Sequence, residues 1–327
     1  VAITNPSGCV ILPNEVERIK AIMLGIARNP NVGGVIFAGL GCESVDAEWF
    51  YNEVKDEKPC AFVRSQDYGS TEAAYAALEA LVLDMRRELE GQERVEAGVS
   101  DICLGVKCGA SDWTTAAASN PAIGVASDII VKNGGVSLLG ETVGWYGGEG
   151  VLTRQSRSKQ TADKVISLLS EMYDRAKMMG RSIEESNPAP GNIAGGISTL
   201  KEKALGNVKK GGAAPVEGAL DFGEYPTGKG LYVVDNPGLD PLSLLGLVCS
   251  GANVLLLDQP TNHLDLESIA ALNNGLEAVK CNVLFSPHDH QLIQTVANRV
   301  FDFTADGRLI DRKMTYDEYL ESVSSMS

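Results

Sequence analysis

Short apolar runs alternate with amphipathic stretches along most of the first 235 residues, and this alternation limits the possible fold more than any other feature. Strands that are apolar on both faces and are connected by helices favour a parallel sheet. The sequence therefore predicts an α/β fold, a mainly parallel sheet with flanking helices. The expected helices cover residues 16–26 (capped by Asn14), 71–87, 121–131 and 158–179, and the expected strands cover GGVIFAGLG and residues 102–106, 136–139 and 231–235.

Residues 183–228 differ from the rest because they are rich in Gly and Pro and have little periodicity. A structureless stretch of this length is uncommon inside a compact chain, so we expect loops packed over the active face. Within it, GEYPTGKG nearly matches a phosphate-binding loop. Gly230 stands where that motif needs a magnesium-binding hydroxyl, and a strand follows instead of a helix, so we interpret the match as chance.

The amino-acid composition of the chain restricts the kinds of partner that it can bind. The net charge of −15 disfavours acidic membrane surfaces and direct nucleic-acid binding. No stretch approaches the roughly 20 apolar residues that cross a bilayer, and the first residues do not resemble a signal peptide, so we expect a cytoplasmic protein. One small group of basic residues stands out from the acidic background. It comprises Lys201, Lys203, Lys209 and Lys210.

Ligands of parallel sheets bind at the carboxyl ends of the strands, which here carry GLGCES, VKCGASD and DNPGLDP. Cys42 and Cys108 lie in two of these loops, and Cys9 lies near the start of the chain in PSGCV. Their small neighbours leave the sulfur atoms accessible, as a nucleophile or a soft-metal ligand requires. The alternative is that each cysteine is a small buried apolar residue.

Several long segments carry a family resemblance. NPNVGGVIFAGLGCE, VKCGASDWTTAAASNPAIGVASDIIV, NPAPGNIAGGISTLKEKALGNVKKGG and GLYVVDNPGLDP resemble the large, C-terminal part of altronate and galactarate dehydratases, over residues 1–253. The resemblance implies a hydro-lyase that uses Fe²⁺ or another divalent metal to remove water from a sugar acid, forming a 2-keto-3-deoxy acid. Some members of the family eliminate sulfite from sulfolactate instead.

The resemblance also implies site residues and partners. A metal would lie near Cys9, Cys42 and Cys108, and acid, base or substrate-orienting roles would fall to Lys107, Asp112, Asn120 and Glu141. A small N-terminal domain, carried by family members in the same chain or as a separate subunit, would be a partner. We also expect a homo-oligomer.

This chain departs from the family pattern. Asn5, Gly144 and Gly150 stand where the family has a histidine, a carboxylate and a histidine, and no histidine precedes His263. A base would therefore have to be Lys, Asp, Glu or a thiolate with a shifted pKa. The sequence leaves open an active dehydratase, an impaired one and a folded chain without activity.

Residues 254–327 form a second region. VLLLDQPTNHLDLESIAALNNGLE and the continuation to residue 320 resemble the C-terminal tail of the ABC-F ATPases, and predict a cassette-type α/β segment. In that family the strand ending at Asp258 is the Walker B strand, which delivers a carboxylate to magnesium. The turn that ends at Asp265 faces a partner cassette.

The tail offers an alternative function, that of an ABC-F ATP-binding fragment without hydrolysis, but nucleotide chemistry is not expected in it. Gln259 replaces the family's catalytic Glu, and Pro287 precedes His288, the position of the switch histidine. The preceding residues contain no Walker A loop and no LSGGQ signature, so nothing would hold the phosphates of ATP against Mg²⁺. We interpret these nucleotide-binding positions as vestigial, and the chain as a fusion whose two parts share one β-strand.

Overall fold

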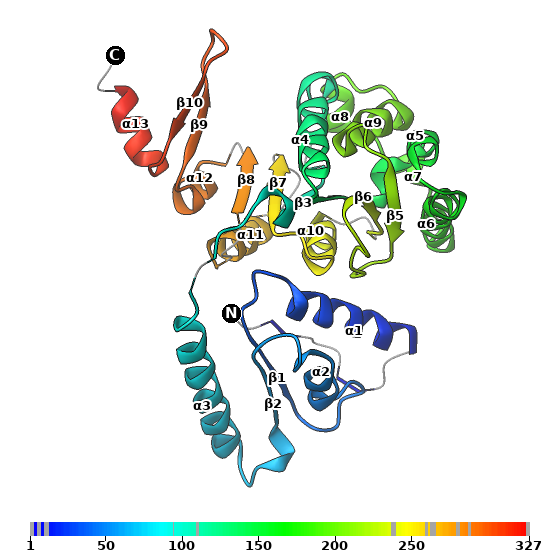
Figure 1. Ribbon diagram of the computed structural model, residues 1–327. Helices are drawn as coiled ribbons and strands as arrows, with labels where there is room; N and C mark the ends of the chain where they lie inside the picture. Colours follow the sequence, from blue (N-terminus) through cyan, green and yellow to red (C-terminus); the bar gives the residue numbers. More distant parts are fainter. Residues whose placement is uncertain are drawn as a thin grey trace.

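The computed structural model describes two parallel sheets and a C-terminal hairpin, connected by helices (Figure 1). It describes residues 3–4, 8–9, 13–93, 95–108, 111–236, 240–258, 261, 266–278, 282–286 and 289–324.

The N-terminal unit is a two-stranded parallel sheet with helices around it. Its core contains Phe37, Phe50 and Val54. The two long helices predicted here are confirmed, although the first begins at Pro13, ahead of the expected cap Asn14. The second strand and the short helix before it were not predicted. The elements are α1 (Pro13–Arg28), β1 (Val35–Gly39), α2 (Ala47–Val54), β2 (Cys60–Arg64) and α3 (Thr71–Glu90).

The second unit is a six-stranded sheet in the order β5-β6-β4-β3-β7-β8, and all of its strands are parallel. The α/β fold with a mainly parallel sheet is therefore confirmed. The strands are β3 (Cys103–Val106), β4 (Val136–Leu139), β5 (Val216–Leu220), β6 (Gly230–Val234), β7 (Val254–Asp258) and β8 (Asn282–Ser286).

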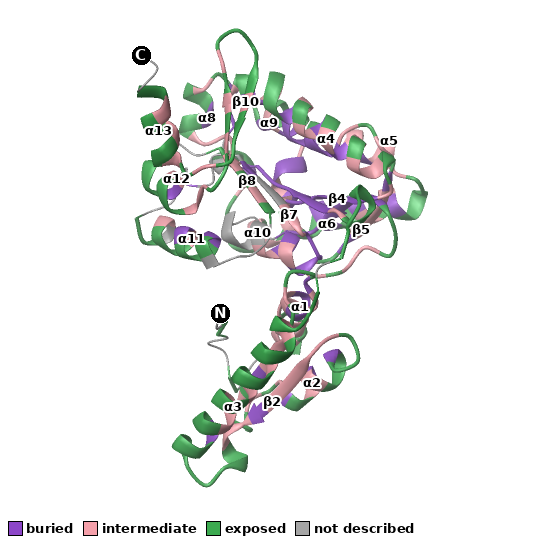
Figure 2. Ribbon diagram, turned by 60° about the vertical axis from the view of Figure 1, so that its left-hand side comes forward, coloured by how far each residue is buried: buried purple, intermediate pink, exposed green. Residues whose placement is uncertain are grey.

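Both faces of this sheet are buried along β3, β4 and β6, whereas the edge strand β8 is partly exposed. Leu138 and Val234 belong to one apolar cluster, whereas their neighbours Leu139 and Val233 belong to the cluster on the opposite face. Figure 2 shows the buried residues gathered along these strands and on the inner sides of the helices. The helices are α4 (Asn120–Lys132), α5 (Glu149–Gln155), α6 (Lys159–Met178), α7 (Ile183–Ser186), α8 (Pro190–Ala194), α9 (Leu200–Asn207), α10 (Asp240–Cys249) and α11 (Leu266–Ala278).

The expectation that residues 183–228 are loops was wrong in part. The stretch contains the short helices α7, α8 and α9, and strand β5 at the edge of the sheet. These helices have four to eight residues each. Helices this short complete few turns, so they leave little periodicity in the sequence. The GEYPTGKG segment precedes strand β6, which agrees with its interpretation as a chance match.

Strand β7 joins the two regions that the sequence distinguished. On one side it pairs with β3, with Val254 opposite Leu104, and on the other it pairs with β8, with Val254 opposite Asn282. Just before β7, the side chain of Asn253 accepts a hydrogen bond from the amide of Cys103 at 2.7 Å and donates one to the carbonyl of Asp101 at 2.8 Å. The two regions therefore form one sheet.

The chain ends in a small hairpin and two helices. β9 (Val300–Phe303) and β10 (Leu309–Arg312) are antiparallel, and α12 (His290–Val296) and α13 (Tyr316–Ser324) lie beside them. Gln294 donates a hydrogen bond to Asp317 at 2.9 Å between these helices. Among the described residues, no helix is both long enough and apolar enough to cross a membrane.

We predict that Asn253→Ala weakens the connection between the two regions. The substitution removes the hydrogen bonds to the backbone of Asp101 and of Cys103, the first residue of β3, and we expect the free energy of unfolding to fall by about 1–2 kcal/mol. Urea denaturation followed by circular dichroism measures this. Asn52→Ala is the control, because the Asn52 side chain makes an exposed bond within its own helix. Equal losses in the two variants would contradict the prediction.

Candidate active site

The loop that follows β4 carries a glutamate in an unusual conformation. Glu141 has φ 70° and ψ 74°, and is the one non-glycine residue with positive φ in the described part of the chain. Its Oε2 accepts a hydrogen bond from the backbone amide of Cys108 at 2.9 Å. Left-handed backbone of this kind costs energy and persists only where the surroundings hold it.

Buried contacts fix the residues on both sides of Glu141. The hydroxyl of Thr142 donates to Asp235 at 2.9 Å and accepts from the backbone amide of Asn236 at 2.7 Å. The indole of Trp145 donates to the carbonyl of Gly140 at 3.2 Å. Thr142 and Trp145 are fully buried. The ends of β4 and β6 are thereby tied together.

Asp235 lies at the end of β6 and is almost completely buried. Burial raises its pKa, against the opposing effects of the Thr142 hydroxyl and of Arg175, whose guanidinium lies 3.8 Å away. The strand end DNPGLDP was expected to line the active face, and these contacts place Asp235 beside the Glu141 loop.

A buried lysine supports the same loop from the other side. Lys210 is 0% exposed, and its ammonium donates to the side-chain oxygen of Asn207 at 2.7 Å. Asn207, which is also buried, donates in turn to the carbonyl of Gly144 at 3.2 Å. Neither residue was predicted as a site residue. Lys210 was seen only as one of a group of basic residues, because its burial leaves no signal in the sequence.

Lys107 and Cys108 follow β3, and both are buried. The sulfur of Cys108 lies 3.0 Å from the hydroxyl of Ser111, and either group can be the donor. The carbonyl of Ser111 accepts a hydrogen bond from Asn192 of α8 at 2.9 Å. The structure therefore brings together Cys108 and Glu141, which the resemblance had placed in one site.

Asp112 begins the helical segment beyond this loop. Its Oδ1 accepts from the hydroxyl of Thr114 at 2.6 Å, and from the amide and hydroxyl of Thr115 at 2.7 and 2.9 Å. The Thr114 hydroxyl is the main cause that lowers the pKa of Asp112, and the Thr115 bonds act in the same direction. This is the geometry of a helix N-cap.

Asn120 lies about two turns further along, at the start of α4, and is 2% exposed. Its amide nitrogen donates to the carbonyl of Gly206 at 3.0 Å, while its Oδ1 is buried without a hydrogen-bond partner in the described structure. Asp112 and Asn120 therefore hold helices in place, and their expected catalytic or orienting roles remain predictions.

Cys9 and Cys42 lie on the N-terminal unit, in loops joined by a hydrogen bond from the amide of Ser44 to the carbonyl of Gly8 at 3.0 Å. Both cysteines are exposed, unlike Cys108. The structure thus pairs two of the three cysteine loops and places Cys108 on the other sheet. Among the residues that the structure describes, no group of three His, Cys, Asp or Glu side chains could hold a metal ion.

Of the four nucleotide-binding positions expected in the tail, the structure describes only Asp258. Asp258 ends β7 opposite Ser286 of β8. Gln259, Asp265 and His288 lie outside the described residues.

Comparison with known proteins identifies the larger region. Residues 99–258 match the model of the D-galactarate/altronate dehydratase C-terminal domain, and residues 1–90 match that of the second domain of the same enzymes. The first 258 residues belong to the altronate and galactarate dehydratase family. The C-terminal match includes β7, which is the strand that continues into the tail.

Individual relatives of this chain support the same family assignment. The chain is 33% identical to altronate dehydratase of Bacillus subtilis over 251 residues, which is 76% of this chain and 50% of that protein. It is 31% identical to the (2R)-sulfolactate sulfo-lyase subunit beta of Chromohalobacter salexigens over 246 residues, which is 72% of this chain and 61% of that subunit. The chain thus spans about half the length of the dehydratases that it matches.

The tail has a different origin. A 73-residue stretch, 22% of this chain, is 60% identical to 13% of the ABC transporter ATP-binding protein YkpA of Bacillus subtilis. This is about the length of the segment from residue 254 to residue 327. The chain therefore joins a dehydratase region to an ABC ATPase-like segment.

We predict a pH-dependent cost for Asp112→Ala. The carboxylate caps a helical segment, and we expect the substitution to remove about 1 kcal/mol at pH 7. Because folding lowers the pKa of Asp112, this contribution is complete above the ordinary carboxyl pKa of about 4 and is lost as the pH falls through the lower folded value. Urea denaturation of both proteins at pH 7 and pH 3 measures it. If the two proteins differ more in free energy of unfolding at pH 3 than at pH 7, the assignment of Asp112 as a cap is contradicted.

Proposed function

We propose that this chain is a hydro-lyase of sugar acids, removing water from a 2,3-dihydroxy acid to give a 2-keto-3-deoxy acid. Both matched domain models come from altronate and galactarate dehydratases, and altronate dehydratase is also among the relatives. The proposed active site lies at the carboxyl edge of the large sheet, where parallel α/β sheets bind their ligands.

The anchored, left-handed Glu141 is the observation that carries the proposal. Strained backbone is concentrated at functional sites, where the fold holds one side chain in a defined place. Glu141 is held by the amide of Cys108, by the Thr142 contacts and by the chain from Lys210 through Asn207. In a chain with no histidine before His263, such a carboxylate is a suitable acid or base.

The reaction has two proton-dependent steps. A base removes the proton from C2, next to the substrate carboxylate, and the electron pair forms the double bond to C3 as the C3 hydroxyl leaves as water with a proton from an acid. The resulting enol then tautomerises to the 2-keto acid. We propose that Glu141 is the base that removes the C2 proton.

Lys107 follows β3, and Glu141 follows the neighbouring strand β4. The positive charge of Lys107 would stabilise the negative charge that develops at C2 and on the substrate carboxylate as the C2 proton leaves. Asp112 and Asn120 shape the loop and helix that face this edge.

The steps above are assigned to the chain's own side chains. The family resemblance implies Fe²⁺ or another divalent cation, which would act as a Lewis acid. Cys9 and Cys42 are exposed on the N-terminal sheet, whereas the Cys108 sulfur is buried beside Ser111. The described residues do not assemble a set of three ligands, so they do not fit the expected metal centre in this arrangement.

Sulfite elimination is the second candidate. The sulfolactate sulfo-lyase subunit is matched over a larger share of its length than the dehydratases are. The chemistry starts with the same C2 proton, and only the group that leaves C3 differs. An ATP-dependent role for the tail has less support, because the residues before Asp258 contain no Walker A loop and no LSGGQ signature, and we expect no binding of ATP with Mg²⁺.

The test is release of 2-keto acid from a panel of 2,3-dihydroxy acids, with 3-sulfolactate included and released sulfite measured in parallel. We expect slow but measurable turnover by the native chain, supplied with Fe²⁺ or Mn²⁺. Glu141→Gln should lower kcat by about 10²–10⁴-fold, because an amide cannot take the proton.

Lys159→Ala is the matched control, since Lys159 is exposed on α6 and pairs only with Asp163 among its described contacts. It should turn over substrate like the native chain. Silence of the native chain on every substrate would overturn the proposed function, and unchanged kcat in Glu141→Gln would overturn the role of Glu141.

A further inference from the structure

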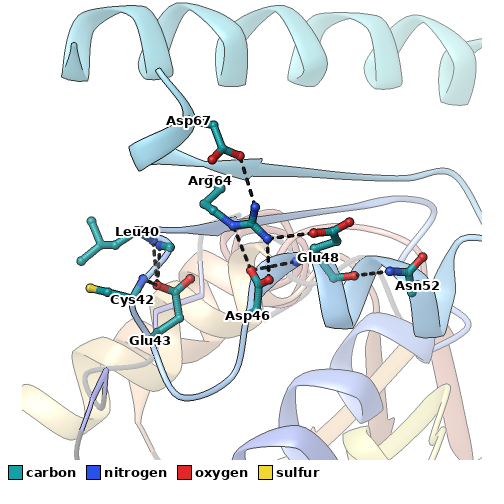
Figure 3. A network of polar contacts seen from close by, with 9 residues as sticks. Leu40, Cys42, Glu43, Asp46, Glu48, Asn52, Arg64 and Asp67 are labelled. Carbon is teal, nitrogen blue, oxygen red and sulfur yellow. Dashed lines mark hydrogen bonds and ion pairs between the residues drawn. The ribbon is translucent and has the colours of Figure 1, made fainter. Parts of the chain in front are cut away.

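The loop after β1 encloses a carboxylate of the chain itself. The backbone amides of Leu40, Gly41 and Cys42 all donate to Oε2 of Glu43, at 3.1, 2.7 and 3.1 Å. Figure 3 shows the Glu43 side chain folded back towards these amides. Successive amides that converge on one point form an anion-binding concavity. The loop therefore has the donors of an anion site, and Glu43 occupies it.

Two glycines make this arrangement possible. Gly41 has φ +111°, a conformation that other residues rarely adopt. A Cβ atom at Gly39 would lie 1.8 Å from Oε1 of Glu43, so only glycine leaves room for the carboxylate. The loop also lies at the carboxyl ends of two parallel strands, because the carbonyl of Leu40 accepts from the amide of Gln66 just after β2 at 3.0 Å.

Glu43 fits the site incompletely. Its Oε1 is buried and has no hydrogen-bond partner in the described structure. Arg64 is a cationic side chain beside the loop, and it packs against Gly41 and pairs with Asp46 at 2.5 Å and Glu48 at 2.8 Å. A buried oxygen without a donor is costly, and that cost is relieved when the side chain turns out into water.

We propose that the Leu40–Cys42 loop is a binding site for a small carboxylate, and that Glu43 occupies it in the free protein and is displaced by the ligand. A ligand carboxylate would take the place of Oε2 on the three amides, while both oxygens of Glu43 become hydrated. The site lies on the N-terminal sheet and is independent of the role proposed for Glu141. Acetate and a sugar acid share the required chemistry.

Chemical rescue tests this site. Glu43→Ala in the full chain leaves three amides without an acceptor, and we expect its Tm to fall below that of the native chain. Sodium acetate at about ten times its Kd should then raise the Tm of Glu43→Ala by about 3 °C relative to sodium chloride at equal ionic strength. Galactarate in a parallel series shows whether the site also admits a polyhydroxy acid.

Two further variants keep the test decisive. Glu48→Ala removes a neighbouring carboxylate that does not contact the amides, and its Tm should respond to acetate no more than that of the native chain. Glu43→Gln retains an oxygen acceptor for the amides, so it should fold and gain less from acetate than Glu43→Ala. If Glu43→Ala is unfolded, acetate should restore its folding where chloride does not. Equal responses to acetate and chloride, or equal responses of Glu43→Ala and Glu48→Ala, would overturn the proposal.

Discussion

Strand β7 is the element on which the rest of the structure depends. Its backbone pairs with β3 of the dehydratase region on one side and with β8 of the ATPase-like tail on the other. Unpaired backbone groups of a buried strand would cost free energy at every residue, so β7 links the two regions by necessity. Parallel pairing uses backbone groups and requires only apolar side chains, which the VLLL run of β7 supplies. A junction within such a strand can therefore join unrelated sequences into one sheet.

The candidate active site depends on the same sheet. Glu141 follows β4, its carboxylate accepts a hydrogen bond from the amide of Cys108 after β3, and its neighbour Thr142 is tied to the end of β6. β3 also pairs with β7, and β7 pairs with β8, so the tail is connected through β7 to the strand that precedes Cys108.

The sequence was sufficient to predict much of the architecture of the large sheet. Apolar runs at residues 136–139 and 231–235 correctly indicated strands buried on both faces. A hydrogen bond joins the loops of Cys108 and Glu141, and the roles expected for these two residues stay predictions. The role of Lys210 could not be predicted, because a buried and an exposed lysine look alike in a sequence. The separation of Cys42 from Cys108 was also hidden, since loop composition does not reveal which of two sheets carries a strand.

Hydrogen exchange followed by mass spectrometry tests the central claim, that the two regions are one folded unit. If β7 is a shared strand, the amides of β7 and β8 exchange with the same free energy of opening as those of β3 and β4, and all four strands lose protection together as denaturant is added. Exchange of β7 and β8 at a much lower free energy, while β3 and β4 stay protected, would contradict the account.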